Sequence, residues 1–166
     1  MLLAIISDIH DNLANLKKCL DWCRRAGATS LICCGDLTTI ETASYLARNF
    51  TGEIFVAEGN AEIYKEAELN KFKNVSYYGE IGINEINGVK IGFCHEPQKI
   101  KKVQELSPFA LDFIFYGHTH KPWLEKKENT IIANPGTLSD VFNTASFALL
   151  DTAKKNLELK ILADLS

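Results

Sequence analysis

The sequence has no long apolar run and no excess of positive charge. No stretch of its 166 residues approaches the roughly 20 apolar residues that a membrane-spanning helix needs. The formal net charge is -3 at pH 7, so there is no general field to attract nucleic acid or an anionic membrane. Met1 leads into an apolar stretch without a basic start or a cleavage site, so we expect no secretory signal and a cytoplasmic location.

A disulfide framework is also missing. The five cysteines are an odd number, with Cys33 and Cys34 adjacent and Cys19 and Cys23 one helical turn apart. Neither spacing matches a disulfide scaffold or a zinc knuckle. We therefore expect reduced, mostly buried thiols in a reducing compartment. The alternative is soft-metal binding by Cys19 and Cys23, but two thiolates alone do not complete a tetrahedral site.

The chain does contain a series of short apolar runs that each end at a polar residue. Runs rich in Ile, Val, Phe and Leu, bounded by Gly or polar residues, predict buried strands. Five such runs cover residues 2–7, 30–34, 54–58, 89–94 and 113–116. Helical periodicity separates several of them, over 12–26 with Gly27 as a stop, over 39–49 and, with a poorer match, over 62–70. Alternating strands and helices predict parallel strands with helices on the faces.

The later part of the chain changes character. Turn signals such as Asn87-Gly88 and Asn134-Pro135-Gly136 separate further short strands. These strands are expected over 74–78, 81–86, 121–127, 130–133, 146–151 and 157–162. They predict a second, more antiparallel sheet. The expected fold is therefore α/β, a four-layer α-β-β-α sandwich of two mixed sheets flanked by helices. With no linker or repeat, we expect one domain over residues 1–166.

Polar side chains follow the five earlier strands. These residues are Asp8, Asp36, Asn60, His95 and His118. In open α/β sheets ligands collect outside the carboxyl ends of the strands, so these residues would converge. His10 and His120 lie two positions beyond Asp8 and His118, and residues i and i+2 of an extended segment point to the same side.

All four histidines of the chain fall in these positions. A lone histidine is more often a residue satisfied by hydrogen bonds, but that does not explain why every histidine is placed alongside Asp and Asn. We therefore expect two divalent ions roughly 3.5–4 Å apart, which need a bridging carboxylate and several outer ligands. Oxygen and imidazole donors without thiolate suit manganese, our first expectation, or nickel, iron, cobalt and zinc. Calcium prefers all-oxygen cages.

Five short motifs contain the candidate metal ligands, and their order along the chain resembles that of a known family. The blocks are Asp8-Ile9-His10, Gly35-Asp36, Gly59-Asn60, His95 and Gly117-His118-Thr119-His120. Their order resembles the calcineurin-like metallophosphoesterase superfamily over nearly the whole chain. The stretch Asn134-Pro135-Gly136-Thr137 narrows the resemblance to the compact bacterial and archaeal phosphodiesterase branch, which includes the retromer scaffold subunit.

The resemblance assigns the donors to two metal ions. One ion would be held by Asp8, His10 and His120. The other would be held by Asn60, His95 and His118. The bridge between the ions would be Asp36.

The resemblance also assigns supporting residues. Asn134 and Gly136 would shape the loop beside the site, with an ordinary turn as the alternative. Asn12 would orient Asp8 or touch the phosphate, with a helix N-cap as the favoured alternative.

Two positions depart from the family pattern. The residue after Gly59-Asn60 is often histidine in the superfamily, and often cysteine or another polar residue in this branch, and here it is Ala61. Histidine there helps to stabilise the transition state and to protonate the leaving group, and alanine does neither. General acid catalysis is typically worth about 10²–10⁴-fold, so esters with poor leaving groups should react slowly. His95 is followed by Glu96, where the family often has His-Gly-His.

The expected function is a phosphoesterase, with a phosphodiesterase favoured, that hydrolyses a small phosphate ester. A hydroxide bridging the two ions would attack phosphorus in line. The alternative is a metal-binding interaction scaffold with weak turnover. Its partner surface would use Trp123, Phe109 or Phe142, although core packing is their favoured role. A nucleic-acid enzyme is disfavoured in this acidic chain, despite a local basic rim offered by Lys99, Lys101 and Lys102. The oligomeric state is open, with a homodimer as one option.

Overall fold

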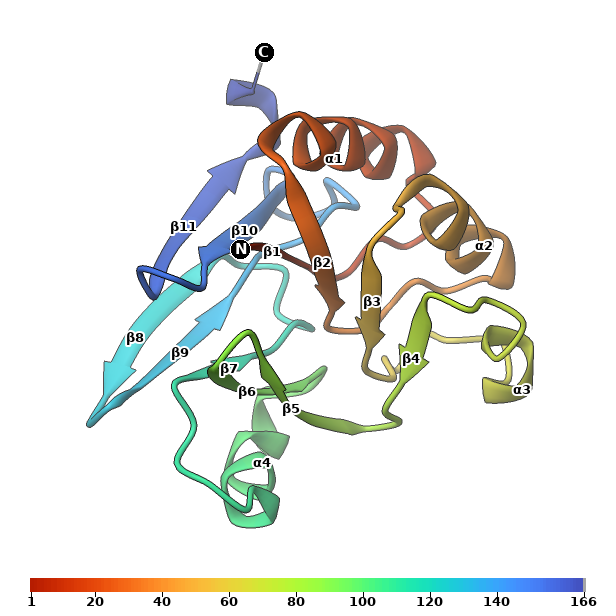
Figure 1. Cartoon of the computed structure of the whole chain (residues 1–166). Coiled ribbons are helices and arrows are strands. Elements are labelled where there is room, and N and C mark those ends of the chain that lie inside the picture. Colours follow the sequence, from red (N-terminus) through yellow and green to blue (C-terminus); the bar gives the residue numbers. More distant parts are fainter. Residues whose placement is uncertain (166) are drawn as a thin grey trace.

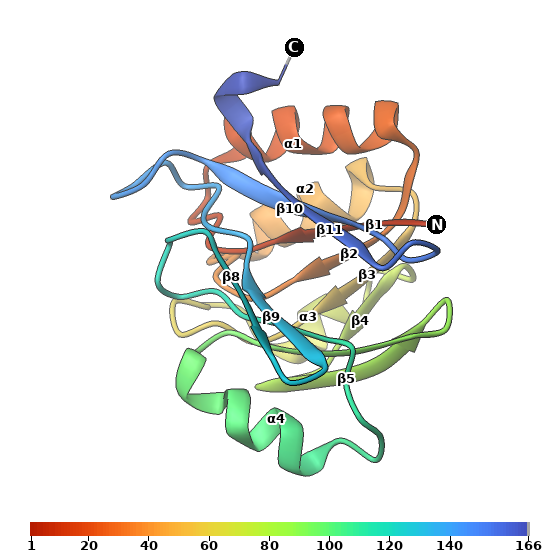
Figure 2. The same cartoon turned by 90° about the vertical axis from the view of Figure 1, so that its left-hand side faces the viewer.

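Two β-sheets lie face to face between helices in this computed structural model, which describes residues 1–165. The strands are β1 (Leu2–Ile6), β2 (Ala28–Cys33), β3 (Glu53–Val56), β4 (Val75–Tyr77), β5 (Ile81–Ile86), β6 (Val89–Cys94), β7 (Phe113–Phe115), β8 (Trp123–Lys127), β9 (Thr130–Asn134), β10 (Ser146–Asp151) and β11 (Asn156–Ile161). The α-helices are α1 (Leu13–Ala26), α2 (Ile40–Asn49), α3 (Glu66–Leu69) and α4 (Ile100–Leu106). Helices α1 and α4 lie on opposite sides of the two sheets (Figures 1 and 2), so the predicted four-layer sandwich is confirmed. Ser166, the last residue of the predicted domain, lies outside the described residues.

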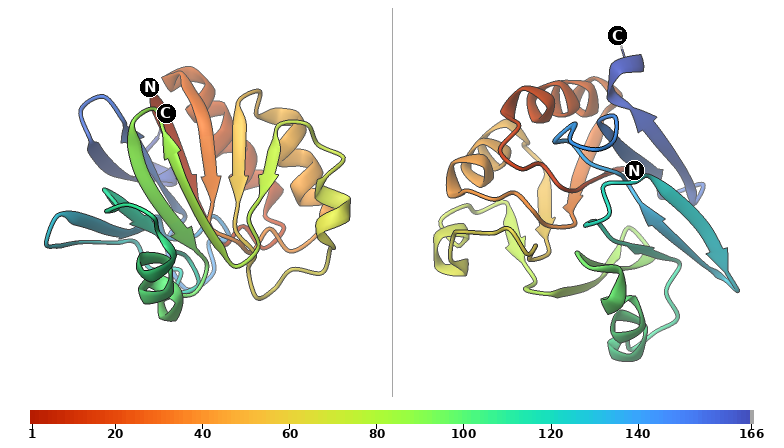
Figure 3. Two further views of the ribbon diagram at one scale, coloured as in Figure 1. Left: turned by 60° about the horizontal axis from the view of Figure 1, so that its bottom comes forward. Right: turned by 180° about the vertical axis from the view of Figure 1, so that it is seen from behind.

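Both sheets are mixed. The first has the order β11-β10-β1-β2-β3-β4, in which β1 to β4 run parallel and β10 and β11 pair antiparallel. The second has the order β5-β6-β7-β9-β8, in which β6, β7 and β9 run parallel. Its edge strands β5 and β8 pair antiparallel with their neighbours. Figure 3 shows the same two sheets from below and from behind.

The sorting of strands between the sheets differs from the prediction. Strands β6 and β7, predicted with the early parallel series, lie in the second sheet, whose centre is parallel. Strands β4, β10 and β11, predicted with the later antiparallel series, lie in the first sheet. An apolar run shows that a strand is buried but does not show which strand it pairs with, because pairing is decided by contacts far along the chain.

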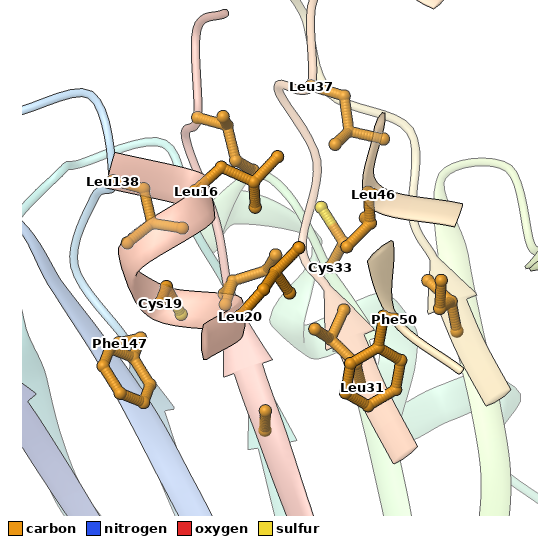
Figure 4. Close-up of a cluster of buried hydrophobic side chains, with 14 of the residues drawn as sticks. Leu16, Cys19, Leu20, Leu31, Cys33, Leu37, Leu46, Phe50, Leu138 and Phe147 are labelled. Carbon is orange, nitrogen blue, oxygen red and sulfur yellow. The ribbon is translucent and has the colours of Figure 1, made fainter. Parts of the chain in front are cut away.

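Three buried clusters hold the four layers together. On β1, Ala4 and Ile6 face the helices while Leu3 and Ile5 face the other sheet, so both faces of the strand are apolar. Figure 4 shows the helix-side cluster, in which the labelled residues are Leu16, Cys19, Leu20, Leu31, Cys33, Leu37, Leu46, Phe50, Leu138 and Phe147. A third cluster packs Val103 of α4 on the second sheet.

The helices agree with the sequence at their capped ends and differ elsewhere. Helix α1 begins after the N-cap Asn12 and ends at Gly27, which has a left-handed φ of 80°, as expected. The helix predicted over 62–70 is reduced to α3, a single turn. Helix α4 was not predicted, because it is only 7 residues long and its N-cap residue, Lys99, makes no side-chain capping bond.

Two side chains, Trp123 and Phe142, differ in exposure from the expectation, whereas the cysteines agree with it. All five cysteines are free and buried, as predicted. Phe109 packs partly buried against the third cluster. Core packing is wrong for Trp123 and Phe142, which are 47% and 91% exposed. Across residues 1–165, no helix combines the length and the apolar character needed to span a membrane.

Candidate metal centre

The seven predicted donors come together from both sheets. They stand on the loops that follow β1, β2 and β3 of the first sheet and β6 and β7 of the second. We call these seven residues the metal centre: Asp8, His10, Asp36, Asn60, His95, His118 and His120. The convergence predicted from the strand ends is found, but the strands belong to two sheets rather than to a single parallel series. The carboxyl ends of parallel strands in two sheets meet at one place.

The first group contains Asp8, His10 and His120. His10 Nε2 and His120 Nε2 are 3.2 Å apart. Asp8 Oδ1 lies 3.2 Å from His120 Nε2 and 3.8 Å from His10 Nε2. Ligand bonds of about 2.0–2.2 Å would separate neighbouring ligand atoms by about 3–3.5 Å. Two of the three separations fall in that range and the third, at 3.8 Å, is slightly longer, so the three side chains lie close enough together to hold one cation.

The second group contains Asn60, His95 and His118. Asn60 Oδ1 lies 2.9 Å from His95 Nε2 and 2.8 Å from His118 Nδ1. His95 Nδ1 donates to the Cys34 carbonyl at 2.8 Å, so in a neutral ring Nε2 carries a lone pair. That lone pair faces an amide oxygen, which a cation between them would turn from a repulsive contact into shared coordination.

Asp36 lies between the two groups. Its Oδ2 is 3.4 Å from His10 Nε2 and 3.3 Å from His95 Nε2. Its Oδ1 accepts a hydrogen bond from the Ala61 backbone N–H at 2.9 Å. Asp36 therefore stands where a bridging carboxylate would have to be.

The charge of the centre also fits a cation. Asp8 is fully buried, and burial raises the pKa of its carboxyl group even though the nearby histidines act to lower it. Burial acts to lower the pKa of His95, but the hydrogen bond and charge of Asp36 outweigh it and raise the pKa. Within residues 1–165, the ion-pair partners of Asp8 and Asp36 are all histidines. Two buried carboxylates without Lys or Arg need positive charge from another source, and metal ions compete with protons for these ligands.

The backbone of the ligand loops is left-handed rather than extended. Five of the seven donors have positive φ: Asp8, His10, Asp36, His118 and His120. The extended i, i+2 geometry predicted for the two pairs is therefore wrong, and His118 and His120 point to different groups. Hydrogen bonds between the loops hold these costly conformations, since the Asp36 carbonyl accepts from Ile9 N at 2.9 Å and His10 N at 3.1 Å.

Glycines in three of the motifs allow the loops to approach one another. A Cβ on Gly59 would lie 2.1 Å from Asp36 Oδ1. A Cβ on Gly117 would lie 1.9 Å from Ser7 Oγ and 2.7 Å from Asp8 Oδ2. Gly35, with φ of 98°, would meet Gly59 and His95 at 2.8 Å. The glycines before Asp36, Asn60 and His118 are thus needed for space, and Gly35 is needed for its left-handed conformation as well.

Glu62 is a supporting residue that the sequence analysis missed. Its carboxylate accepts from Leu37 N at 3.2 Å, Thr38 N at 2.8 Å and Gly59 N at 3.4 Å. It therefore ties the loop that carries Asp36 to the loop that begins with Gly59. Burial raises the pKa of Glu62, although the two backbone donors on the Asp36 loop oppose the shift. One indication of this role was present in the sequence, because Glu62 directly follows Ala61, which departs from the family pattern.

The supporting residues predicted from the sequence lie around the centre. Asn12 Oδ1 accepts from Asn15 N at 3.0 Å, as an N-cap does, and Asn12 Nδ2 donates to the Ser139 carbonyl at 3.0 Å. Asn134 Nδ2 donates to the Gly117 carbonyl at 2.8 Å, and its Oδ1 accepts from Gly136 N at 2.8 Å. Asn134 therefore forms a turn with Gly136 and at the same time holds the loop of His118 and His120.

The predicted basic rim carries little free charge. Lys99 lies 3.0 Å from both Glu80 and Glu96. Lys102 lies 3.8 Å from Glu80, and Lys101 lies 3.7 Å from Glu105. These pairs leave no strong positive patch to steer phosphate, so metal ions remain the main positive charge available at the centre.

Known proteins of similar sequence and fold cover nearly the whole of this chain. Phosphodiesterase MJ0936 of Methanocaldococcus jannaschii is 26% identical over 159 residues, which cover 93% of this chain and 95% of that protein. The structure of an archaeal phosphodiesterase aligns with a TM-score of 0.86 at 22% identity, covering 97% of this chain and 99% of that chain. Vps29 of Entamoeba histolytica, complexed with zinc, aligns with a TM-score of 0.73 at 22% identity, covering 100% of this chain and 95% of that chain. Both structural similarities concern the fold alone.

The family itself is shown by its sequence profile. The profile described as the calcineurin-like phosphoesterase superfamily domain matches residues 1–155. That match includes every residue of the metal centre and both supporting residues of the Asn134 turn. The chain therefore belongs to the calcineurin-like phosphoesterase superfamily.

Proposed function

We propose that this protein hydrolyses a small phosphate diester at the metal centre, with two divalent ions bound. The family is one of metal-dependent phosphoesterases. The observation that carries the proposal is the position of Asp36 Oδ2, 3.4 Å from a histidine of one group and 3.3 Å from a histidine of the other. Manganese is the proposed metal, since the donors are oxygen and imidazole without thiolate.

The bound ions would supply the charge that acidifies a water and neutralises phosphate oxygens. Backbone groups of the chain orient the side chains that would hold the ions. The His118 backbone N–H orients Asp8 at 3.0 Å, and the Ala61 N–H orients Asp36. The Cys34 carbonyl fixes the ring of His95. The water would attack phosphorus in line with the leaving oxygen.

Ala61 limits the leaving groups that this site would serve. Its backbone N–H is used by Asp36, and its methyl side chain has no proton to give. The leaving oxygen would therefore depart as an anion or take a proton from solvent. Diesters with acidic alcohols or phenols are the favoured substrates, because they need little help from a general acid. The name of the archaeal relative, a phosphodiesterase, supports a diester over a monoester.

A second candidate is an interaction scaffold of the same fold that binds metal and turns over weakly. Ala61 and the exposed side chains of Trp123 and Phe142 favour it. The complete set of seven donors favours the enzyme. The five free, buried thiols support a reducing compartment, and we propose the cytoplasm.

A hydrolysis assay on protein loaded with manganese or nickel separates the two candidates. We expect turnover of bis(p-nitrophenyl) phosphate, and a loss of at least about 10²-fold in Asp36→Asn, because the bridging charge is removed. Asp164→Asn, the same change at an exposed carboxylate, is the matched control. Equal rates in wild type and Asp36→Asn would refute the enzyme at this site. Anomalous scattering at the metal absorption edges should reveal two ions.

A further inference from the structure

Phe142 is the most exposed large apolar side chain among residues 1–165, at 91%. Phenylalanine rings usually contribute much of the buried apolar area of a fold. The φ of Phe142 is 68°, in the left-handed region that bulky residues rarely adopt. Position 142 therefore holds an apolar ring in water on an unfavourable backbone conformation. Backbone strain of this kind is concentrated at sites that bind ligands.

The ring lies beside the metal centre. The centroids of Phe142 and His120 are 6.0 Å apart, with the rings tilted by 55°. The carbonyl of the adjoining Val141 accepts from His120 Nδ1 at 3.3 Å. His120 Nε2 faces Asp8 on the other side. Phe142 thus flanks the ligand that would hold one metal ion, next to where the phosphate would bind.

The loop that presents Phe142 is fixed at both ends. Ser139 N donates to the Asp8 carbonyl at 3.0 Å. Ala145 N donates to Asp140 Oδ1 at 3.0 Å. These bonds tie the loop to the backbone of a metal-centre residue and close it on itself. The ring at its tip is therefore displayed in a defined place.

We propose that Phe142 stacks on a planar aromatic group of the substrate, so that the site prefers aryl or nucleobase-bearing phosphate esters to alkyl esters. The inference rests on the proposed function and narrows its substrate class. Aromatic rings gain from offset stacking or edge contacts, and stacking on a protein ring accepts any base because every base has a π-face. Ala61 agrees with an aryl ester, since a phenolate leaves without a general acid.

Inhibition by phosphonates tests this stacking directly. Methyl p-nitrophenyl phosphate serves as the reporter substrate for the manganese-loaded protein. Phenylphosphonate and methylphosphonate differ only in the ring. We expect Phe142→Ala to weaken inhibition by phenylphosphonate about 5- to 150-fold, the range of base stacking on an aromatic side chain. Inhibition by methylphosphonate should weaken less than about twofold. Adenosine 5′-monophosphate shows whether the stacked ring can be a nucleobase. Its inhibition should weaken in Phe142→Ala only if a nucleobase reaches Phe142.

Further variants separate stacking from simple hydrophobic contact. Phe142→Trp should restore phenylphosphonate inhibition, whereas Phe142→Leu, apolar but not planar, should not. Leu106 is an exposed apolar residue on α4. Leu106→Ala should leave the inhibition constants of both phosphonates unchanged.

The proposal and the function beneath it fail in different ways. Equal weakening of the two phosphonates, or no change in either, would overturn the stacking while hydrolysis of the reporter stands. No hydrolysis of any diester by the wild type would remove the proposed function itself. Loss of self-association in Phe142→Ala with unchanged inhibition would assign the ring to contact between two copies.

Discussion

Substitution of Gly59 by alanine tests how the metal centre is positioned. The new Cβ would lie 2.1 Å from Asp36 Oδ1 and 2.2 Å from Asp36 N. Ordinary van der Waals contact begins at 3.4 Å, so the two groups must separate by about 1.2–1.3 Å. The φ of Gly59 lies outside the left-handed region, so the substitution acts through this clash alone.

That displacement is large for a metal ligand. Asp36 Oδ2 is held 3.3 Å from His95 Nε2 and 3.4 Å from His10 Nε2. Metal sites tolerate deviations of about 0.2 Å in ligand distance, and a misplacement of about 1 Å can cost about 10²-fold in rate. We expect Gly59→Ala to weaken manganese binding and diester hydrolysis by at least about 10²-fold.

Calorimetric titration with manganese and hydrolysis of bis(p-nitrophenyl) phosphate give the two readouts, and thermal unfolding shows whether the variant folds. Gly88→Ala is the control, because its φ of 77° is strained but no atom lies within 4 Å of the new Cβ. The control should lose about 1 kcal/mol of stability and keep its metal affinity. Wild-type metal affinity in a folded Gly59→Ala would refute the positioning of Asp36 through this contact.

Two further predictions concern stability away from the centre. The five thiols are buried, and burial raises the pKa of Cys33 and Cys34, so the native protein should react with a disulfide reagent far more slowly than the unfolded chain, which should titrate as five thiols; rapid native reaction at neutral pH would contradict this burial. Partial burial acts to raise the pKa of Asp112, but bonds from Lys155 Nζ at 2.7 Å and Lys90 N at 2.9 Å outweigh it and lower the pKa below 3.8. The pair therefore stabilises the fold above pH 3.8, and that contribution is lost as pH falls through the lower native value. Asp112→Asn should reduce the free energy of unfolding at neutral pH by about 0.5–1 kcal/mol, discounted because the pair is partly exposed, with a smaller difference in acid; an equal difference at both pH values would exclude this origin.

The residues of the candidate site were easier to predict from the sequence than the pairing of the strands. Five of the seven residues end a short apolar run, and three of them, Asp36, Asn60 and His118, directly follow a glycine. Local patterns were therefore enough to select the residues that the structure brings together. Helix α1 was bounded by the cap Asn12 and the stop Gly27 for the same reason. Local signals missed Glu62, because a buried carboxylate that binds three backbone N–H groups looks in sequence like any loop glutamate. They also misjudged Phe142, since an aromatic residue usually marks a core.

The sequence by itself determined the strands, the capped helices and which polar residues follow the strands, because hydrophobic periodicity and turn chemistry act over a few residues. Only the tertiary structure decided which strands pair, and therefore that two sheets rather than one supply the donors. It also decided the left-handed turns that separate His118 from His120. His10 and His120 are 110 residues apart in the chain and 3.2 Å apart in space. A contact of that kind follows from burying both faces of two sheets at once, which no local pattern specifies.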